Sequence, residues 1–365
     1  MIDPLIVDAH QDLVWNMFTF GRDYTLSAAD TRKREEGTLT PQVNGDSLLG
    51  WPDYQNGKVG VVFSTLYAAP ARLRLGEWDQ QCYATDKEAH MLYSRQLDAY
   101  TRLADEHPAM FQLIKKKLDL QSILAHWKRN DTQEHPVGLV ILMEGAEGVR
   151  EPAELEDWYQ RGVRIIGPAW AGTRFCGGTH EPGPLTKDGF ELLDRMAEFR
   201  FTLDLSHMDE KAALQALDTY AGPVIASHAN AMELSKESSS NRHLTNREIQ
   251  GLLERGGTIG IVPFNGFLKP NWNETGGRAS VTLDYVTAQI DYICQMAGNA
   301  LHVGIGSDFD GGFGLQAVPS EINSVADLRK IIPLLSQKGY TERDISAIMG
   351  GNWINHLQNT LPEDL

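Results

Sequence analysis

Several short apolar runs of this sequence end in a histidine or an acidic residue, the side chains that bind divalent metal ions. The first is the stretch LIVDAHQDL, in which His10 and Asp12 follow the apolar residues 5–7. On an extended strand, side chains two residues apart point the same way, so this pair could hold one cation. A hydrogen-bonded His–Asp pair is the alternative. Asp8 would orient the motif without binding the metal, or would simply be a turn residue.

Three further runs end in the same way. Glu144 follows the residues LVILM, where an unpaired carboxylate would be costly to bury unless it faces water. His207 and His228 each close an apolar run after a serine, roughly one strand–helix unit apart. Neighbouring strands are about 4.8 Å apart, so the two imidazoles could reach a common ion.

Together these residues have the composition of a two-metal site. Three histidines and two carboxylates suffice for two divalent ions if Glu144 bridges them. Such a pair lowers the pKa of a shared water and polarises a carbonyl, as amide hydrolysis requires. Asp308, in GIGSDFDGG, could pass a proton from the attacking water to the leaving nitrogen, or could be a turn residue. The dinucleotide-binding fingerprint is incomplete there, because its third glycine and following helix are missing.

Eight apolar runs must position these residues. They lie at 5–9, 59–67, 137–144, 163–170, 201–207, 223–228, 257–264 and 301–308, and helix-like segments separate most of them. Alternation of strand and helix indicates a parallel sheet, and eight units favour an α/β fold of the (β/α)8 TIM-barrel type over an open doubly wound sheet. In a barrel the carboxyl ends of all strands meet on one face. The predicted barrel would therefore bring the candidate residues together.

The whole chain, 1–365, is predicted to be a single barrel domain with C-terminal helices and an insertion near 21–57. Residues 30–54 of this insertion are rich in charge, Gly, Asn and Pro and show no period, so they could form a lid or a solvated loop. Two helical stretches follow the last strand, and Thr341 with Asp344 resembles a capping box at the start of the second.

Net charge, cysteine spacing and the lengths of apolar runs argue against several classes of partner and site. With 33 basic and 49 acidic residues the net charge is -16, which argues against nucleic acid or an anionic membrane as a partner. The three cysteines are far apart and form no CxxC pair, so neither a disulfide framework nor a thiolate zinc site is indicated. Without a signal peptide or an apolar run of about 20 residues, a cytoplasmic protein that does not associate with membranes is expected.

The motifs VDAHQDL, MEGAEG, LDLSHMDEKAALQAL, PVIASHANA, NRHLTNREI and VGIGSDFDGG occur in this order over nearly the whole chain. In these motifs the sequence resembles the membrane dipeptidase, or renal dipeptidase, family of binuclear zinc peptidases, which belong to the amidohydrolase-like hydrolases. The resemblance implies a dipeptide or a related amide as substrate and hydrolysis by a hydroxide that bridges two Zn²⁺ ions. A homo-oligomer is plausible on the same ground.

Carried over to this sequence, the resemblance implies a role for each motif residue. One zinc would be bound by His10 and Asp12 and the other by His207 and His228, with Glu144 bridging both and Asp308 as the catalytic acid and base. Arg242 would hold the substrate carboxylate, a role that suits its forked guanidinium. From its spacing alone, Arg242 would be interpreted as a solvated loop charge, so this role rests mainly on the resemblance.

Two residues depart from the family pattern. Trp170 stands where many members have a histidine that contacts the substrate carbonyl, and it either contacts substrate or packs at the barrel rim. Asn265 and its neighbours replace a common Asn-Phe-Tyr element and are also predicted to contact substrate. These changes leave open an amidohydrolase that acts on N-acyl amino acids or lactones. A metal-stabilised binding protein without catalytic activity is the third possibility.

Overall fold

The computed structural model describes residues 2–129, 134–235 and 240–363. Eight of the nine parallel strands of its central sheet follow one another in the order β11-β10-β7-β6-β2-β1-β13-β12. They are β1 (Ile6–Gln11), β2 (Val59–Tyr67), β6 (Val137–Glu144), β7 (Val163–Gly167), β10 (Thr202–Asp204), β11 (Val224–Ile225), β12 (Ile259–Ile261) and β13 (Val303–Ile305). Each overlaps one of the eight predicted apolar runs. The predicted α/β barrel is therefore confirmed.

The two ends of this strand order meet between β11 and β12. A single parallel bridge joins Ala226 to Ile259 there. The side chain of Asn230 extends the pairing, because its amide nitrogen donates to the Val262 carbonyl at 3.0 Å and its oxygen accepts from the Val262 amide at 2.9 Å. The barrel thus closes through a short seam between residues 226–230 of the β11 segment and 259–262 of the β12 segment. In this seam the Asn230 side chain makes the hydrogen bonds to Val262 that the backbone of a neighbouring strand would otherwise make.

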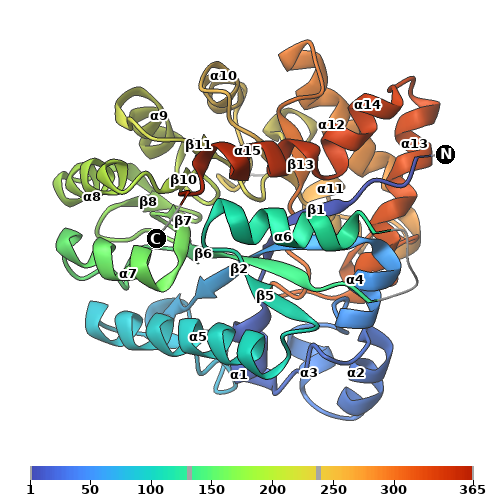
Figure 1. Cartoon of the computed structure of the whole chain (residues 1–365), viewed down its shortest axis with the longest axis horizontal. Helices are drawn as coiled ribbons and strands as arrows, with labels where there is room; N and C mark the ends of the chain where they lie inside the picture. The colour runs from blue at the N-terminus through green and yellow to red at the C-terminus, as the bar shows by residue number, and fades with distance from the viewer. Residues whose placement is uncertain (1, 130–133, 236–239, 364–365) are drawn as a thin grey trace.

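Helices surround the strands (Figure 1). Between strands lie α1 (Leu13–Phe20), α5 (Asp86–Glu106), α6 (Lys117–Trp127), α7 (Leu155–Arg161), α8 (Lys187–Glu198), α9 (Glu210–Thr219), α10 (Asn246–Glu254), α11 (Asn265–Leu268) and α12 (Leu283–Ala297). Short 3-10 turns lie at Ala71–Leu73, Pro152–Glu154, Met232–Ser235, Arg278–Ser280 and Leu315–Ala317. The remaining strands are β5 (Phe111–Leu113), which pairs with β6, and two small pairs, β3 (Ala69–Pro70) with β4 (Cys82–Tyr83) and β8 (Cys176–Gly178) with β9 (Glu181–Leu185).

The segment 21–57 is folded and packed, so its interpretation as a solvated loop is wrong. It contains α2 (Ala28–Glu35), α3 (Thr40–Val43) and α4 (Trp51–Gly57). Tyr24, Leu48 and Leu49 within it are buried in the main hydrophobic core. These apolar residues anchor the segment by packing against distant parts of the chain. Because their partners are distant, the residues show no helical or strand period in the sequence.

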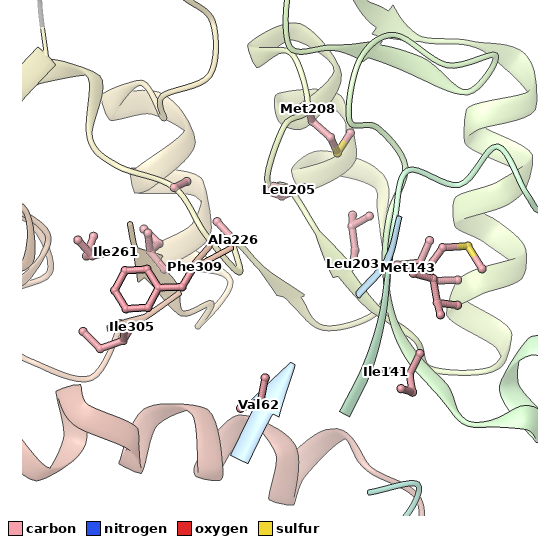
Figure 2. Packing of buried hydrophobic residues seen from close by; sticks show 14 of the residues in the cluster. Val62, Ile141, Met143, Leu203, Leu205, Met208, Ala226, Ile261, Ile305 and Phe309 are labelled. Atoms are coloured by element: carbon pink, nitrogen blue, oxygen red, sulfur yellow. The ribbon is translucent and has the colours of Figure 1, made fainter. Parts of the chain in front are cut away.

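Burial on both faces of the sheet explains why the strands read as continuous apolar runs. Every residue of β1 and β6 is buried, as expected for a parallel sheet covered by helices. Figure 2 shows buried side chains of five strands, namely Val62, Ile141, Leu203, Ile261 and Ile305. Because this core fixes the strands, it also fixes the residues at their carboxyl ends.

The C-terminal region is helical, as predicted. A 3-10 stretch (Val325–Lys330) leads into α13 (Ile331–Gln337), and α14 (Glu342–Ser346) continues through a π-helical turn (Ala347–Gly351) into α15 (Asn352–Thr360). The Thr341 hydroxyl accepts from the Asp344 amide while the Asp344 carboxylate accepts from the Thr341 amide, which confirms the capping box. Among the residues that the structure describes, no helix combines the length and apolar character needed to span a bilayer.

Candidate metal centre and substrate cavity

Glu144 lies at the centre of a cluster formed at the ends of four strands, β1, β6, β10 and β11. Its Oε2 is 3.6 Å from His10 Nε2. Its Oε1 is 3.1 Å from His207 Nε2 and 3.5 Å from His228 Nε2. Asp12 lies on the same side of Glu144 as His10, with its Oδ2 3.9 Å from His10 Nε2. The structure therefore brings the five predicted metal ligands together, with one Glu144 oxygen directed to each side.

The donor set of this cluster fits divalent metal ions. Two groups of three could each hold one ion, His10–Asp12–Glu144 and Glu144–His207–His228, and they share Glu144. His10 Nε2 is buried without a hydrogen-bond partner, as expected of a nitrogen that binds metal. Gly311 leaves the space open, because a Cβ there would lie 2.2 Å from Asp308 Oδ1.

Hydroxyl groups of neighbouring residues orient the ligands. Thr179 Oγ1 is 2.9 Å from His207 Nδ1, and Ser227 Oγ is 2.8 Å from His228 Nδ1. Thr65 donates to the Asp12 carboxylate. Such partners fix the tautomer and ring orientation of metal-binding histidines, and here they leave both Nε2 atoms directed at Glu144.

These hydroxyl residues were missed from the sequence. Thr65 stands two residues before the end of its predicted run and could have been found from the strand pattern. Thr179 belongs to the β8–β9 hairpin, for which the sequence gives no signal.

Charges within the cluster shift the pKa of each ligand. Burial lowers the pKa of His10, but the carboxylates of Glu144, Asp12 and Asp308 outweigh it and raise the pKa to about 10. Burial and the charge of Arg242 lower the pKa of His207 to about 3. The same negative potential that favours a proton on His10 favours a metal cation. His207, in contrast, is neutral and has a lone pair available.

Backbone strain marks two of the site residues. His207 has φ of 68° and Asp308 of 57°, a left-handed conformation that residues other than glycine rarely adopt and that clusters at functional sites. Asp308 Oδ1 lies 3.8 Å from His10 Nε2, and burial raises the pKa of its carboxyl well above the usual range. Asp8 stands outside the cluster and accepts from the Ser307 amide at 2.6 Å, so it fixes β1 against the strand end that carries Asp308.

Arg242 is buried beside the cluster, so its interpretation as a solvated loop charge is wrong. Its Nη2 donates to the His228 carbonyl at 2.7 Å, and its guanidinium lies 5.5 Å from the ring centroid of Phe267. Its Nε is buried without a hydrogen-bond partner. Arg242 is nevertheless one of the residues that line the cavity.

A cavity of about 680 Å³ lies directly above the cluster. Its lining includes three of the predicted metal ligands, Asp12, Glu144 and His207, together with Arg242 and Asp308. Most of the remaining lining is apolar, and the sequence did not single it out: Trp15, Val43, Tyr67, Leu73, Leu75, Trp78, Phe264, Phe267 and Phe313.

The two departures from the family pattern lie in different places. Trp170 lines the cavity, with its ring centroid 6.1 Å from that of His207 and 5.3 Å from that of Tyr67. Asn265 is fully buried outside the lining, and its amide donates to the Val318 carbonyl at 3.1 Å. Asn265 is therefore not among the described residues that line the cavity, whereas its neighbours Phe264 and Gly266 are. Its predicted substrate contact stays a prediction.

Comparison with known proteins shows the family of this chain. The model of the membrane dipeptidase family (peptidase family M19) matches residues 1–360. An uncharacterized protein encoded in the pqqA 5' region of Klebsiella pneumoniae is 32% identical over 238 residues, which cover 62% of this chain and 83% of that protein. Dipeptidase ataJ of Aspergillus terreus is 27% identical over 309 residues, or 75% of this chain and 70% of that protein.

A solved structure shares the fold. A metallo peptidase from Rhodobacter sphaeroides, liganded with a phosphinate mimic of the dipeptide L-Ala-D-Ala, superposes with a TM-score of 0.76 at 22% identity and covers 98% of this chain and 100% of its own. Because the family model extends over nearly all of the sequence and the family's motifs meet at one end of the barrel, the chain belongs to the membrane dipeptidase family of metallopeptidases.

Proposed function

We propose that this chain hydrolyses the amide bond of dipeptides with two zinc ions. The placement of Glu144 carries the proposal, since one of its oxygens faces His10 and the other faces His207 and His228. His10 and Asp12 would hold one ion and the two other histidines the second, and bound zinc would polarise the peptide carbonyl and activate water. Imidazole and carboxylate ligands favour zinc but accept other divalent ions.

Arg242 binds the carboxylate of the substrate. Arg242 lines the cavity beside the metal cluster, where its positive charge attracts a carboxylate. A charge-assisted hydrogen bond in a buried site is strong, so this contact fixes one end of the substrate. It also limits the substrate to molecules that carry a carboxylate at that distance from the scissile bond.

Asp308 moves the proton. Its carboxylate lines the same cavity and stands beside His10, within reach of a water that attacks the scissile carbon. It accepts the proton of that water and donates it to the leaving amine, which departs as the free amino group of the second residue.

A chelation experiment with a substrate panel tests the proposal. The protein is dialysed against a chelator, reloaded with zinc, and assayed on L,L- and L,D-dipeptides and on N-acyl amino acids. We expect no turnover after chelation and recovery of dipeptide hydrolysis with zinc. Full activity without metal would reject the metal-dependent mechanism.

Trp170 makes N-acyl amino acids the competing substrates, because its bulk stands where many family members have a histidine. Hydrolysis of N-acyl amino acids without hydrolysis of free dipeptides would favour this second function. A cytoplasmic location and a homo-oligomer stay predictions from the sequence.

A further inference from the structure

Four aromatic side chains form one wall of the cavity, here called the aromatic wall: Trp15, Tyr67, Trp78 and Trp170. Their rings meet edge to face. The centroids of Trp15 and Tyr67 are 6.0 Å apart, those of Trp15 and Trp78 are 6.4 Å apart, and those of Tyr67 and Trp170 are 5.3 Å apart. The wall is therefore one continuous surface that presents ring faces and edges to a ligand.

The aromatic wall stands across the barrel from Arg242. Tyr67 ends β2 and Trp78 lies in the segment that follows it, whereas Arg242 lies in the segment that follows β11. In the ring of eight strands, β2 and β11 are four strands apart in either direction. A ligand that spans the cavity from Arg242 and passes over Glu144 at the centre thus reaches the aromatic wall.

The segment that carries Trp78 is held in place before any ligand binds. Arg74 Nε donates to the carbonyls of Gly76 and Asp79 at 3.0 and 2.9 Å, and the Leu75 amide donates to the Asp79 carboxylate at 3.3 Å. Leu75 itself is 77% exposed and extends the apolar lining to the cavity mouth. A preformed apolar surface loses little conformational entropy on binding, which favours a ligand that can cover it.

We propose that the aromatic wall binds the side chain of the substrate's amino-terminal residue, and that this enzyme prefers dipeptides with a large apolar, best an aromatic, residue at that position. The inference rests on the proposed function, because Arg242 fixes the carboxylate end of a dipeptide and the metal cluster fixes its scissile bond. The first residue then points toward β2. An aromatic side chain there gains edge-to-face contacts with the tryptophans, and a methyl group does not.

Four dipeptides and two variants test this assignment. The zinc-loaded enzyme is assayed for kcat/KM on Phe-Ala, Ala-Phe, Ala-Ala and Lys-Ala, each in L,L and L,D form. We expect Phe-Ala to exceed Ala-Ala and Lys-Ala by roughly tenfold or more. Trp78→Ala should remove most of that preference, chiefly through KM, and should leave the ratio of Ala-Phe to Ala-Ala unchanged. Trp78 is only half-buried, so the fold should survive the change.

Leu75→Asp serves as the second variant, since an exposed position tolerates substitution without loss of the fold. It should lower kcat/KM for Phe-Ala more than for Ala-Ala, because the charge interrupts the apolar mouth. Tyr285→Ala, which removes an aromatic side chain from the exposed face of α12, is the matched control and should change neither value.

The outcomes distinguish a failure of the specificity assignment from a failure of the proposed dipeptidase function. Cleavage of all four dipeptides without a preference for Phe-Ala would overturn the specificity assignment and leave the dipeptidase function standing. If Trp78→Ala lowered kcat/KM for Ala-Phe alone, the dipeptide would lie in the opposite orientation and the specificity assignment would be overturned. A preference of the wild-type enzyme for Lys-Ala would overturn it as well. If the zinc-loaded enzyme cleaves no dipeptide, the proposed function fails and this inference fails with it.

Discussion

At the scale of single residues, the loop that carries Asp308 depends on a buried ion pair. Arg22 Nη1 lies 3.0 Å from Asp310 Oδ2, and Arg22 Nε donates to Glu35 at 2.8 Å. Tyr24 and Ser47 also donate to the Asp310 carboxylate. Asp310, two residues after Asp308, is thus fixed from the segment 21–57.

Replacing Arg22 by methionine should therefore destabilise the protein by about 3–5 kcal/mol, because the change leaves Asp310 and Glu35 as buried charges without their partner. The matched control is Lys33→Met, which breaks the exposed Lys33–Asp30 pair and should cost no more than about 0.5 kcal/mol. Urea denaturation of the three proteins measures both values. Equal losses in the two variants would contradict the structural role given to the buried pair.

Asp308→Asn should lower kcat by roughly 10²- to 10⁴-fold, because asparagine cannot accept the proton of the attacking water. Metal content, measured by elemental analysis, should stay at the wild-type value. Asp308 also belongs to a group with His10 and His228 that could hold an ion. A variant that lost one metal equivalent would show that Asp308 is a ligand and that the proton is moved by another group.

At the scale of secondary structure, the helix α10 contains an acid whose protonation matters to stability. Burial, helped by the charges of Glu210 and Asp209, raises the pKa of Glu248 to about 7, although hydrogen bonds from Thr245 oppose the rise. Glu248 forms the capping box of α10 with Thr245. Between about pH 4.5 and pH 7 the folded protein therefore keeps a proton on Glu248 that the unfolded chain has lost.

The raised pKa of Glu248 makes the free energy of unfolding depend on pH. Since the folded pKa lies above the ordinary value of 4.5, the unfolded chain releases the proton first and the wild-type protein loses stability as pH rises from about 4.5 to about 7. Glu248→Gln keeps a capping side chain without this titration. The variant should gain relative to wild type by up to about 3 kcal/mol between pH 5 and pH 8.

Urea midpoints at several pH values measure this gain. Glu254→Gln, at the exposed C-terminal end of the same helix, is the control and should change the free energy of unfolding by no more than about 0.5 kcal/mol. A constant difference between Glu248→Gln and wild type across this range would contradict the assignment.

How far the sequence predicts these elements depends on where their stabilising contacts come from. The barrel strands are apolar along their whole length because both faces are buried, so their positions were predicted, and with them the ligands at their ends. β5 has only three residues and gives no comparable signal. The burial of Arg242 and the position of Trp78 depend on loops that fold against distant residues, which local sequence does not record.

At the scale of the whole molecule, the metal centre should contribute to stability as well as to catalysis. Asp12, Glu144 and Asp308 lie close together in a buried site, so their charges repel one another until a cation neutralises them. An ion that binds only the folded chain stabilises it by about 2.7 kcal/mol at a free concentration of 100 times its Kd. Zinc should therefore raise Tm above that of the chelated protein.

Differential scanning fluorimetry with and without zinc measures this shift. Glu144→Gln should reduce it strongly, because glutamine cannot bridge two cations as an anion. A metal-dependent rise of the same size in this variant would show that zinc binds elsewhere.

The seam between β11 and β12 gives the barrel a preferred place to open. The Ala226–Ile259 bridge, a hydrogen bond from the Ala229 amide to the Gly260 carbonyl at 2.7 Å and the Asn230 side chain join these strands. His228 lies between Ala226 and Asn230. Sub-global opening at the seam would separate that imidazole from the others while the long β2–β6 pairing stays intact. In native-state hydrogen exchange, the amides of Ala226 and Gly260 should exchange before those of β6, and bound metal should slow them selectively. Bound metal ions would then hold the barrel closed, and the rate of metal release would be set by the rate at which the seam between β11 and β12 opens.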